Sequence, residues 1–155
     1  MRKLAVIPCG KKKIWDVNPS LGPTKVEEAY IGNLHKLTRE YAELFCDEWV
    51  ILSAKHGYCS PFEIIKHNYD ITFGMKTIEA QISYEELKQQ IKEKQLTDYD
   101  QIVVLTGKKH KKVVESTFDG KIPLVFPLLG TMGIGEMQQR LKKAILAKQP
   151  IDHEL

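Results

Sequence analysis

The sequence predicts one α/β domain over residues 1–150, in which helices cover both faces of a mainly parallel, four-stranded sheet. Its 155 residues, 43% hydrophobic and 28% charged, suit a single folded domain with a buried core. Segments with an apolar residue every three or four positions alternate with short apolar runs. The runs, which are typical of strands buried on both faces, are Leu4–Ile7, Trp49–Leu52, Ile102–Leu105 and Ile122–Phe126. Residues 151–155 are expected to form a loose tail.

The first helical pattern begins near Val26 and continues to about Leu44. Thr24 and Glu27 have the spacing of a capping box at its start. Gly32 lies inside the pattern and weakens helix propensity by about 1 kcal/mol, so a break is expected there.

The second helix is predicted from a capping box of Ser83 and Glu86 to about Leu96. Residues 11–25 are predicted to be a loop, and residues 57–80 irregular. Two further helices follow the third and fourth strands, with apolar faces formed by Val113, Val114, Phe118, and by Ile134, Met137, Leu141 and Ile145.

Composition excludes several classes of protein. Three widely spaced cysteines without a CxxC pair do not indicate a disulfide framework or a zinc site, and no metal or cofactor is predicted. No run approaches the about 20 apolar residues of a membrane span, and the N-terminus lacks a signal-peptide core. We therefore expect a cytoplasmic protein with reduced thiols and no membrane partner. The net charge of +3 gives little indication of a partner.

Polar residues and glycines follow every predicted strand, at the edge where open parallel sheets bind ligands. Turns between strands and helices need such residues in any case, but the agreement of four turns favours a site. The residues in chain order are Cys9, Gly10, Lys11, then Ser53, Lys55, His56, then Thr106, Gly107, Lys108, then Gly130, Gly133, Gly135.

Several of these residues have chemistry suited to an anion. Gly10 lets the backbone approach a ligand, and Lys11 can meet a phosphate, although the P-loop spacing is absent. The glycines at 130–135 precede a helix and offer free N–H groups, but they do not form a dinucleotide fingerprint. Cys9 is either a nucleophile activated by nearby lysines or a small buried residue.

A hydroxyl, an amine and an imidazole come together at Ser53, Lys55 and His56. In an extended segment Ser53 and Lys55 point one way and His56 the other, so they are not expected to share one role. His56 either catalyses or holds the loop by hydrogen bonds. Asp70 can bind a sugar hydroxyl, act as a base, or cap a turn.

Lysines are concentrated at 11–13 and at 108–112. Each run can be a solvated face, or the two together can form a basic rim for a phosphate backbone. Lysines at a helix start oppose the helix dipole, which favours a bound anion at the second run.

Several motifs resemble an uncharacterised family of small bacterial and phage domains. They are Ile-Pro-Cys-Gly-Lys-Lys-Lys at 7–13, Ala-Tyr-Ile-Gly at 29–32, Ile-Leu-Ser-Ala-Lys-His-Gly at 51–57, Tyr-Asp-Ile-Thr at 69–72, and the glycine-rich segment at 127–135. That family is similar to the YaaA peroxide-stress proteins and to a domain of archaeosine-type tRNA-modification enzymes, whose related segment has serine in place of Gly10. The resemblance implies a uracil-DNA-glycosylase-like fold, work on nucleobases or nucleic acids, and one pocket formed by 9–11, 53–57, 69–72 and 130–135.

The leading hypothesis is an enzyme that acts on a nucleobase, nucleotide or nucleic acid by glycosidic-bond cleavage or base transfer. Asp70 is the candidate base, Ser53 and His56 orient the substrate, and Lys11 and Lys55 neutralise phosphate. The glycines present backbone donors. One alternative is a nucleic-acid-binding protein without chemistry, which would bind through its lysines. Another is a stress-linked small-molecule sensor without turnover, in which Cys9 could support redox sensing.

Overall fold

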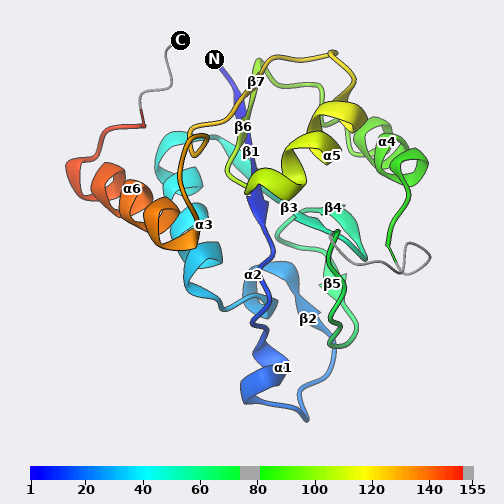
Figure 1. Cartoon of the computed structure of the whole chain (residues 1–155). Helices are drawn as coiled ribbons and strands as arrows, with labels where there is room; N and C mark the ends of the chain where they lie inside the picture. Colours follow the sequence, from blue (N-terminus) through cyan, green and yellow to red (C-terminus); the bar gives the residue numbers. More distant parts are fainter. Residues whose placement is uncertain (74–80, 152–155) are drawn as a thin grey trace.

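The structure, a computed structural model, describes residues 1–73 and 81–151 and is organised around a five-stranded sheet (Figure 1). The spatial order of the strands is β4-β3-β1-β6-β7. Their bounds are β1 Lys3–Pro8, β3 Glu48–Ser53, β4 Gly57–Cys59, β6 Gln101–Val104 and β7 Leu124–Val125. All neighbouring pairs are parallel except β3 and β4.

The four apolar runs predicted as strands correspond to β1, β3, β6 and β7, and the mainly parallel arrangement is confirmed. The predicted number of strands is wrong, because β4 adds a fifth strand that pairs antiparallel to the end of β3. This strand has only three residues and follows β3 after the short turn 54–56. Its sequence, Gly57-Tyr58-Cys59, contains no apolar run that would mark it.

Strand β1 lies in the middle of the sheet, with Ala5 opposite Trp49 of β3 on one side and Val103 of β6 on the other. Its side chains alternate between two hydrophobic clusters, so Ile7 packs on one face and Val6 on the other. Strand β1 is therefore buried on both faces, as its continuous apolar sequence predicts.

The first cluster lies under α3 (Asn33–Phe45) and α6 (Ile134–Ala147), which contact each other. The second lies under α4 (Tyr84–Glu93) and α5 (Lys108–Phe118), which also contact each other. The two helix pairs cover opposite faces of the sheet and give three layers (Figure 1).

The expected break near Gly32 is present and divides the first helical pattern into α2 (Val26–Ala29) and α3. The predicted capping box is wrong, because Thr24 belongs to β2 (Thr24–Lys25) and its hydroxyl donates to the carbonyl of Gly22 at 2.9 Å. Strand β2 pairs with β5 (Ile64–Ile65) in a small two-stranded sheet.

The predicted loop at 11–25 also contains a short helix, α1 (Ile14–Val17). The capping box at the start of α4 is confirmed, since Ser83 Oγ accepts a hydrogen bond from the N–H of Glu86 at 3.1 Å. Ile151 is not part of a loose tail, because it packs against the core and its N–H donates to the hydroxyl of Tyr41 at 3.0 Å. The rest of the predicted tail, 152–155, and residues 74–80 of the predicted irregular segment lie outside the described residues.

Across residues 1–73 and 81–151, no helix combines the length and the apolar character needed to cross a membrane.

Candidate functional site

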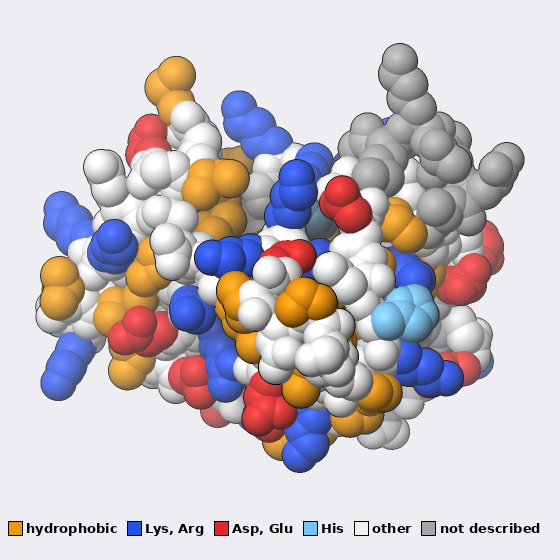
Figure 2. All heavy atoms as spheres, turned by 90° about the horizontal axis from the view of Figure 1, so that it is seen from below, with side chains coloured by type: hydrophobic (Ala, Val, Ile, Leu, Met, Phe, Trp, Pro, Cys, Tyr) orange, Lys and Arg blue, Asp and Glu red, His pale blue; other side chains and the backbone are white. Residues whose placement is uncertain are grey.

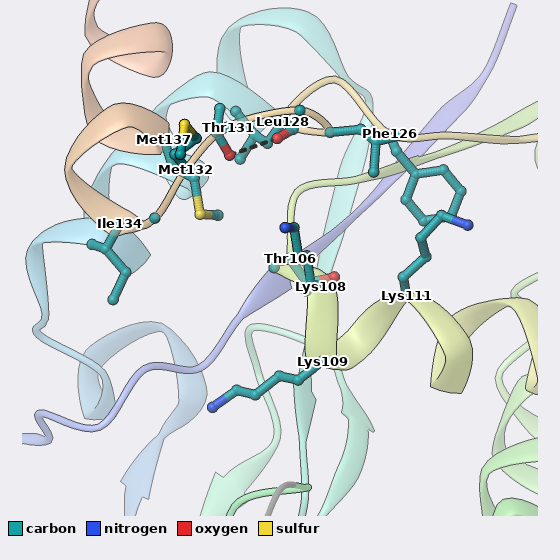
Figure 3. A pocket seen from close by; sticks show the side chains of 14 residues that line it. Thr106, Lys108, Lys109, Lys111, Phe126, Leu128, Thr131, Met132, Ile134 and Met137 are labelled. Atoms are coloured by element: carbon teal, nitrogen blue, oxygen red, sulfur yellow. Dashed lines mark hydrogen bonds between the residues drawn. The ribbon is translucent and has the colours of Figure 1, made fainter.

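Two adjoining cavities lie beside the carboxyl ends of β1 and β6. The outer cavity has a volume of about 570 Å³ and lies between the start of α5 and the turn that precedes α6 (Figure 3). The inner cavity, of about 300 Å³, lies against the segment 8–13 that follows β1 and the segment 69–73. Gly107, Lys109, Ile134 and Met137 line both, so the two cavities join there.

The outer cavity has one apolar wall and one cationic wall. Phe126, Met132 and Ile134 belong to the apolar wall, and the last two are 90% and 60% exposed at its mouth. The cationic wall is the first turn of α5, where Lys111 Nζ lies 5.2 Å from the centre of the Phe126 ring (Figure 3). Lys109 extends in the opposite direction from Lys111 (Figure 3). The outer cavity therefore suits a ligand with a flat apolar part and an anionic part.

The N-terminus of α5 has free hydrogen-bond donors and no negative charge of its own. Its N-cap is Gly107, which provides no side-chain cap, and its first turn contains Lys108 and Lys109 but no acid. His110 N–H bonds the carbonyl of Gly107, whereas the N–H groups of Lys108 and Lys109 meet no acceptor in the described part of the chain. Thr106, directly before the helix, is 7% exposed and its hydroxyl has no partner there. These unsatisfied donors, with the helix dipole and two lysines, form a place for an anion.

Tyr69 connects the inner cavity to the core of the domain. Its hydroxyl hydrogen-bonds Ser53 Oγ at 2.9 Å and also the hydroxyl of Tyr30. Burial raises the pKa of both tyrosines far above the usual value, so both stay protonated. The ammonium groups of Lys13 and Lys55 lie 4.4 and 5.7 Å from the centre of the Tyr69 ring.

Lys13 differs from its neighbours in the lysine run, because Lys11 and Lys12 are exposed whereas Lys13 is only 3% exposed. Its ammonium donates to the carbonyl of Lys11 at 2.9 Å. An isolated β-bridge to Tyr30 turns this residue inward. Sequence reasoning placed all three lysines on a surface, and the run itself contains no signal that separates them.

His110 also lines the inner cavity and was not predicted as a site residue. It is 9% exposed, and its Nδ1 has no partner among the described residues. Burial, and secondarily Lys109, lowers the pKa of His110 to about 4, so the ring is neutral at pH 7. In the sequence it is hidden inside a run of four lysines.

Most of the predicted site residues are brought together. Asp70 lines the inner cavity and is exposed at its mouth, and it is the only carboxylate on either cavity wall in the described chain. Lysine and arginine side chains gather around a recess on this side of the molecule (Figure 2). The other predicted residues on the inner wall are Cys9, Gly10 and Lys11, those on the outer wall are Thr106, Lys108, Gly130 and Gly133, and Gly107 lies on both.

Ser53, Lys55, His56 and Gly135 line neither cavity. Ser53 is fully buried behind Tyr69, and its hydroxyl accepts hydrogen bonds from the N–H groups of Lys55 and His56 at 3.2 and 3.1 Å. Ser53 therefore cannot contact a ligand in this conformation, and it positions Tyr69 instead.

His56 helps to hold its loop through its backbone and the packing of its ring, whereas the ring Nε2 is buried without a hydrogen-bond partner among the described residues. Its carbonyl accepts a hydrogen bond from Gln90 Nε2 at 2.8 Å, and its ring packs edge-on against Tyr69 with centres 4.9 Å apart. Burial lowers the pKa of His56, which favours the neutral ring.

Cys9 is half-buried on the inner wall. Burial raises the pKa of its thiol, and the lowering effect of Lys13 only partly opposes this. Cys9 is therefore a neutral thiol at pH 7, which fits a small buried residue better than an activated nucleophile. In the described chain, no group of three or more His, Cys, Asp and Glu side chains could hold a metal ion.

Comparisons with known proteins place the chain among uncharacterised relatives. Over its whole length it is 43% identical to the "Uncharacterized protein YfjM" of Bacillus subtilis (strain 168), and the alignment covers all of both chains. The solved structure of AF0587, "a protein of unknown function", matches 97% of this chain and 46% of its own with a TM-score of 0.46 and 16% identity. Residues 4–143 match the model described as "Family of unknown function (DUF6884)". The chain belongs to the DUF6884 family.

Proposed function

We propose that the protein is a cytoplasmic enzyme that binds a nucleotide, free or within a nucleic acid, in the joined cavities and cleaves or exchanges its glycosidic bond. The observation that carries this proposal is the direct contact between an apolar cavity and an uncapped, lysine-bearing helix start at Gly107. A nucleotide combines a flat ring with a phosphate at short range, so it fits both walls of this cavity.

The phosphate is assigned to the N-terminus of α5. There the free N–H groups of Lys108 and Lys109 and their ammonium groups supply donors and positive charge. The absence of an acid from this first turn supports the assignment, because two lysines at a helix start oppose the helix dipole unless an anion is bound.

The base is assigned to the apolar wall of the outer cavity. Phe126 offers a ring face, and Met132 and Met137 offer polarizable side chains that pack well against aromatic rings. A cavity of about 570 Å³ falls within the range of small-ligand pockets.

Asp70 is the proposed general base. Glycosidic hydrolysis needs a carboxylate that activates water against an oxocarbenium-like centre, and Asp70 stands at the mouth of the inner cavity. Residues 7–13 resemble a segment of archaeosine-type tRNA-modification enzymes, and this resemblance supports the same chemistry. A uracil-DNA-glycosylase-like fold is part of this proposal.

A second candidate is a nucleic-acid-binding protein without chemistry. Exposed lysines on the cavity rims, among them Lys11, Lys108 and Lys109, favour it. Such a protein would bind all strands alike, with steep dependence on salt.

The test is a thermal-shift and calorimetric screen against nucleobases, nucleosides, nucleoside 5′-monophosphates and short oligonucleotides. A ligand that binds the native state raises Tm, and we expect a selective monophosphate to raise it more than its nucleoside. The double variant Lys108→Gln/Lys109→Gln should lower the binding affinity for that nucleotide at least about tenfold. The matched control is Lys142→Gln/Lys143→Gln, which removes the same charge from exposed positions of α6 away from both cavities.

Turnover is then measured as release of free base by chromatography. Asp70→Asn should keep the affinity and lose the release. Equal shifts by all oligonucleotides that disappear in moderate salt would favour the binding protein, and the absence of any shift by a nucleotide or oligonucleotide would overturn both candidates.

A further inference from the structure

We propose that the inner cavity binds an oxyanion whose counter-ion is the buried ammonium of Lys13. The inner cavity is then a second anion subsite beside the start of α5. Resting on the proposed function, this identifies the substrate class as nucleotides with two phosphate groups, either a nucleoside bisphosphate or a nucleotide flanked by phosphodiesters.

Lys13 is a buried lysine on the wall of the inner cavity. The residue as a whole is only 3% exposed. Ion pairs within 4.0 Å in the described chain join Arg2 to Glu48, Arg39 to Glu43, Lys94 to Glu63 and Lys111 to Glu115, and none includes Lys13. A buried charge without an opposite charge is unfavourable, so this position favours an anion.

The ammonium of Lys13 also has unused hydrogen-bond donors. An ammonium group has three donors, and among described residues Lys13 Nζ bonds only the carbonyl of Lys11, at 2.9 Å. The ring of Tyr69, 4.4 Å away, supplies a cation–π contact but accepts no conventional hydrogen bond. Asp16 interacts electrostatically with Lys13, but its exposed carboxylate forms no ion pair with the ammonium within 4.0 Å and instead accepts from the backbone N–H of Lys13 at 2.8 Å.

His110 and Gly10 offer further donors that do not depend on Lys13. His110 lines the same cavity from α5, and its buried Nδ1 has no partner among the described residues. In the tautomer with hydrogen on Nδ1, this ring donates to an oxyanion without introducing a charge. Gly10, on the opposite loop, has φ +79°, and its N–H bonds no acceptor in the described chain.

The inner cavity and the start of α5 are close enough to bind two anions of one ligand. The inner cavity of about 300 Å³ has room for a tetrahedral oxyanion. It joins the outer cavity at Gly107 and Lys109, so an anion on Lys13 and a phosphate at the start of α5 lie on either side of this junction. The carboxylate of Asp70 lies at the same cavity and would repel a bound anion. Because Asp70 is exposed to solvent, water and salt screen this repulsion.

Inorganic phosphate tests the subsite directly, by NMR titration of the ¹⁵N-labelled full chain. In the wild type we expect the amides of Gly10 and Gly107 both to respond. Lys13→Met keeps the length and apolar stem of the side chain, and it should weaken the response of Gly10 at least about tenfold while Gly107 keeps its response. Lys12→Met removes the charge of the exposed neighbour and should change neither.

Stability separates an anion site from a structural role. If Lys13 serves to bind an anion, Lys13→Met should raise Tm in phosphate-free buffer, because the substitution removes an unbalanced buried charge. Phosphate should then no longer raise the Tm of the variant. A fall in Tm together with an unchanged phosphate response would overturn the proposal.

The substrate class is tested with nucleoside 3′,5′-bisphosphates, the matching 5′-monophosphates and a trinucleotide. The wild type should bind the bisphosphate or the trinucleotide at least about tenfold more tightly than the monophosphate, and Lys13→Met should abolish the difference. Tighter binding of the bisphosphate would indicate a free nucleotide as the substrate, and tighter binding of the trinucleotide would indicate a nucleic-acid strand.

The two proposals fail in different ways. If phosphate acts through Lys13 but no nucleotide binds, the proposed function fails and the subsite stands. If nucleotides bind and Lys13→Met leaves their affinities unchanged, the function stands and this inference fails.

Discussion

The hydroxyl groups of Tyr69 and Ser53 lie 2.9 Å apart in a buried hydrogen bond that joins the 69–73 segment to the end of β3. The same tyrosine hydroxyl bonds Tyr30, which follows α2. Three segments far apart in the sequence therefore meet at one phenol beside the inner cavity.

Tyr69→Phe should lower the free energy of unfolding by about 1–3 kcal/mol, because it leaves the buried hydroxyl of Tyr30 without its partner and removes one of the hydrogen bonds of Ser53. The measurement is urea denaturation. Tyr84→Phe, at an exposed residue, is the control and should change stability by less than about 0.5 kcal/mol. Equal effects of the two substitutions would contradict the importance of this phenol.

Gly57→Ala should be strongly destabilising, by more than about 1 kcal/mol. Gly57 has φ +78°, and an added Cβ would collide with Gln90 Oε1 and approach Ile82 Cδ1 to 2.7 Å. The side chain of Gln90 is fixed by hydrogen bonds to the N–H of Tyr58 and the carbonyl of His56, both 2.8 Å, so it cannot yield freely. Gly22→Ala, where a Cβ meets nothing within 4 Å, is the matched control in the same denaturation experiment, and similar losses would refute the steric reason.

Ser83→Ala should lower the free energy of unfolding by about 1 kcal/mol, because it removes the N-cap that accepts from the N–H of Glu86. Ser20→Ala serves as the control, since Ser20 is exposed and its hydroxyl only meets the side chain of Asn18 at 3.2 Å. Circular dichroism during thermal unfolding measures both. A neutral Ser83→Ala would mean that tertiary packing alone fixes the start of α4.

Stability should fall as the pH drops from about 6.5 to about 4. Burial lowers the pKa values of His35 and His110 to about 4, so both rings are neutral in the folded protein. The unfolded chain binds their protons in this window, and the free energy of unfolding therefore rises with pH there by up to about 1.4 kcal/mol per pH unit for each group.

The variant His110→Gln should flatten this slope, and denaturation at several pH values measures it. His67→Gln, at an exposed histidine, should leave the slope as it is in the wild type. A wild-type slope retained in His110→Gln would show that this ring is accessible to protons in the folded protein.

The sequence predicted the parts of the fold that depend on local patterns. Continuous apolar runs marked β1, β3 and β6 because strands buried on both faces need them. Gly32 marked the break between α2 and α3 because glycine weakens a helix. Strand β4 could not be predicted, because its three residues become a strand only by pairing with the end of β3.

The candidate site was predictable where backbone topology determines it and not where packing does. Cys9, Gly10 and Gly107 follow parallel strands, so they meet at one edge of the sheet. Ser53 is the last residue of β3, but Tyr69 covers it. In the sequence, Lys13 and His110 look like members of solvated charge runs. Only tertiary contacts distinguish them from their exposed neighbours: Lys13 pairs with Tyr30, and His110 packs against Phe73.

The central position of β1 has a consequence for how a ligand reaches the inner cavity. Amide hydrogens of a strand paired on both sides exchange with solvent only in large unfolding events, so the backbone that leads to Cys9 and Gly10 keeps its shape while the protein is folded. The opposite wall, from Tyr69 to Phe73, belongs to no strand or helix and is held at Tyr69 by side-chain bonds. We expect faster hydrogen exchange on this wall, which would make it the side that opens to admit a ligand while the wall of β1 stays closed.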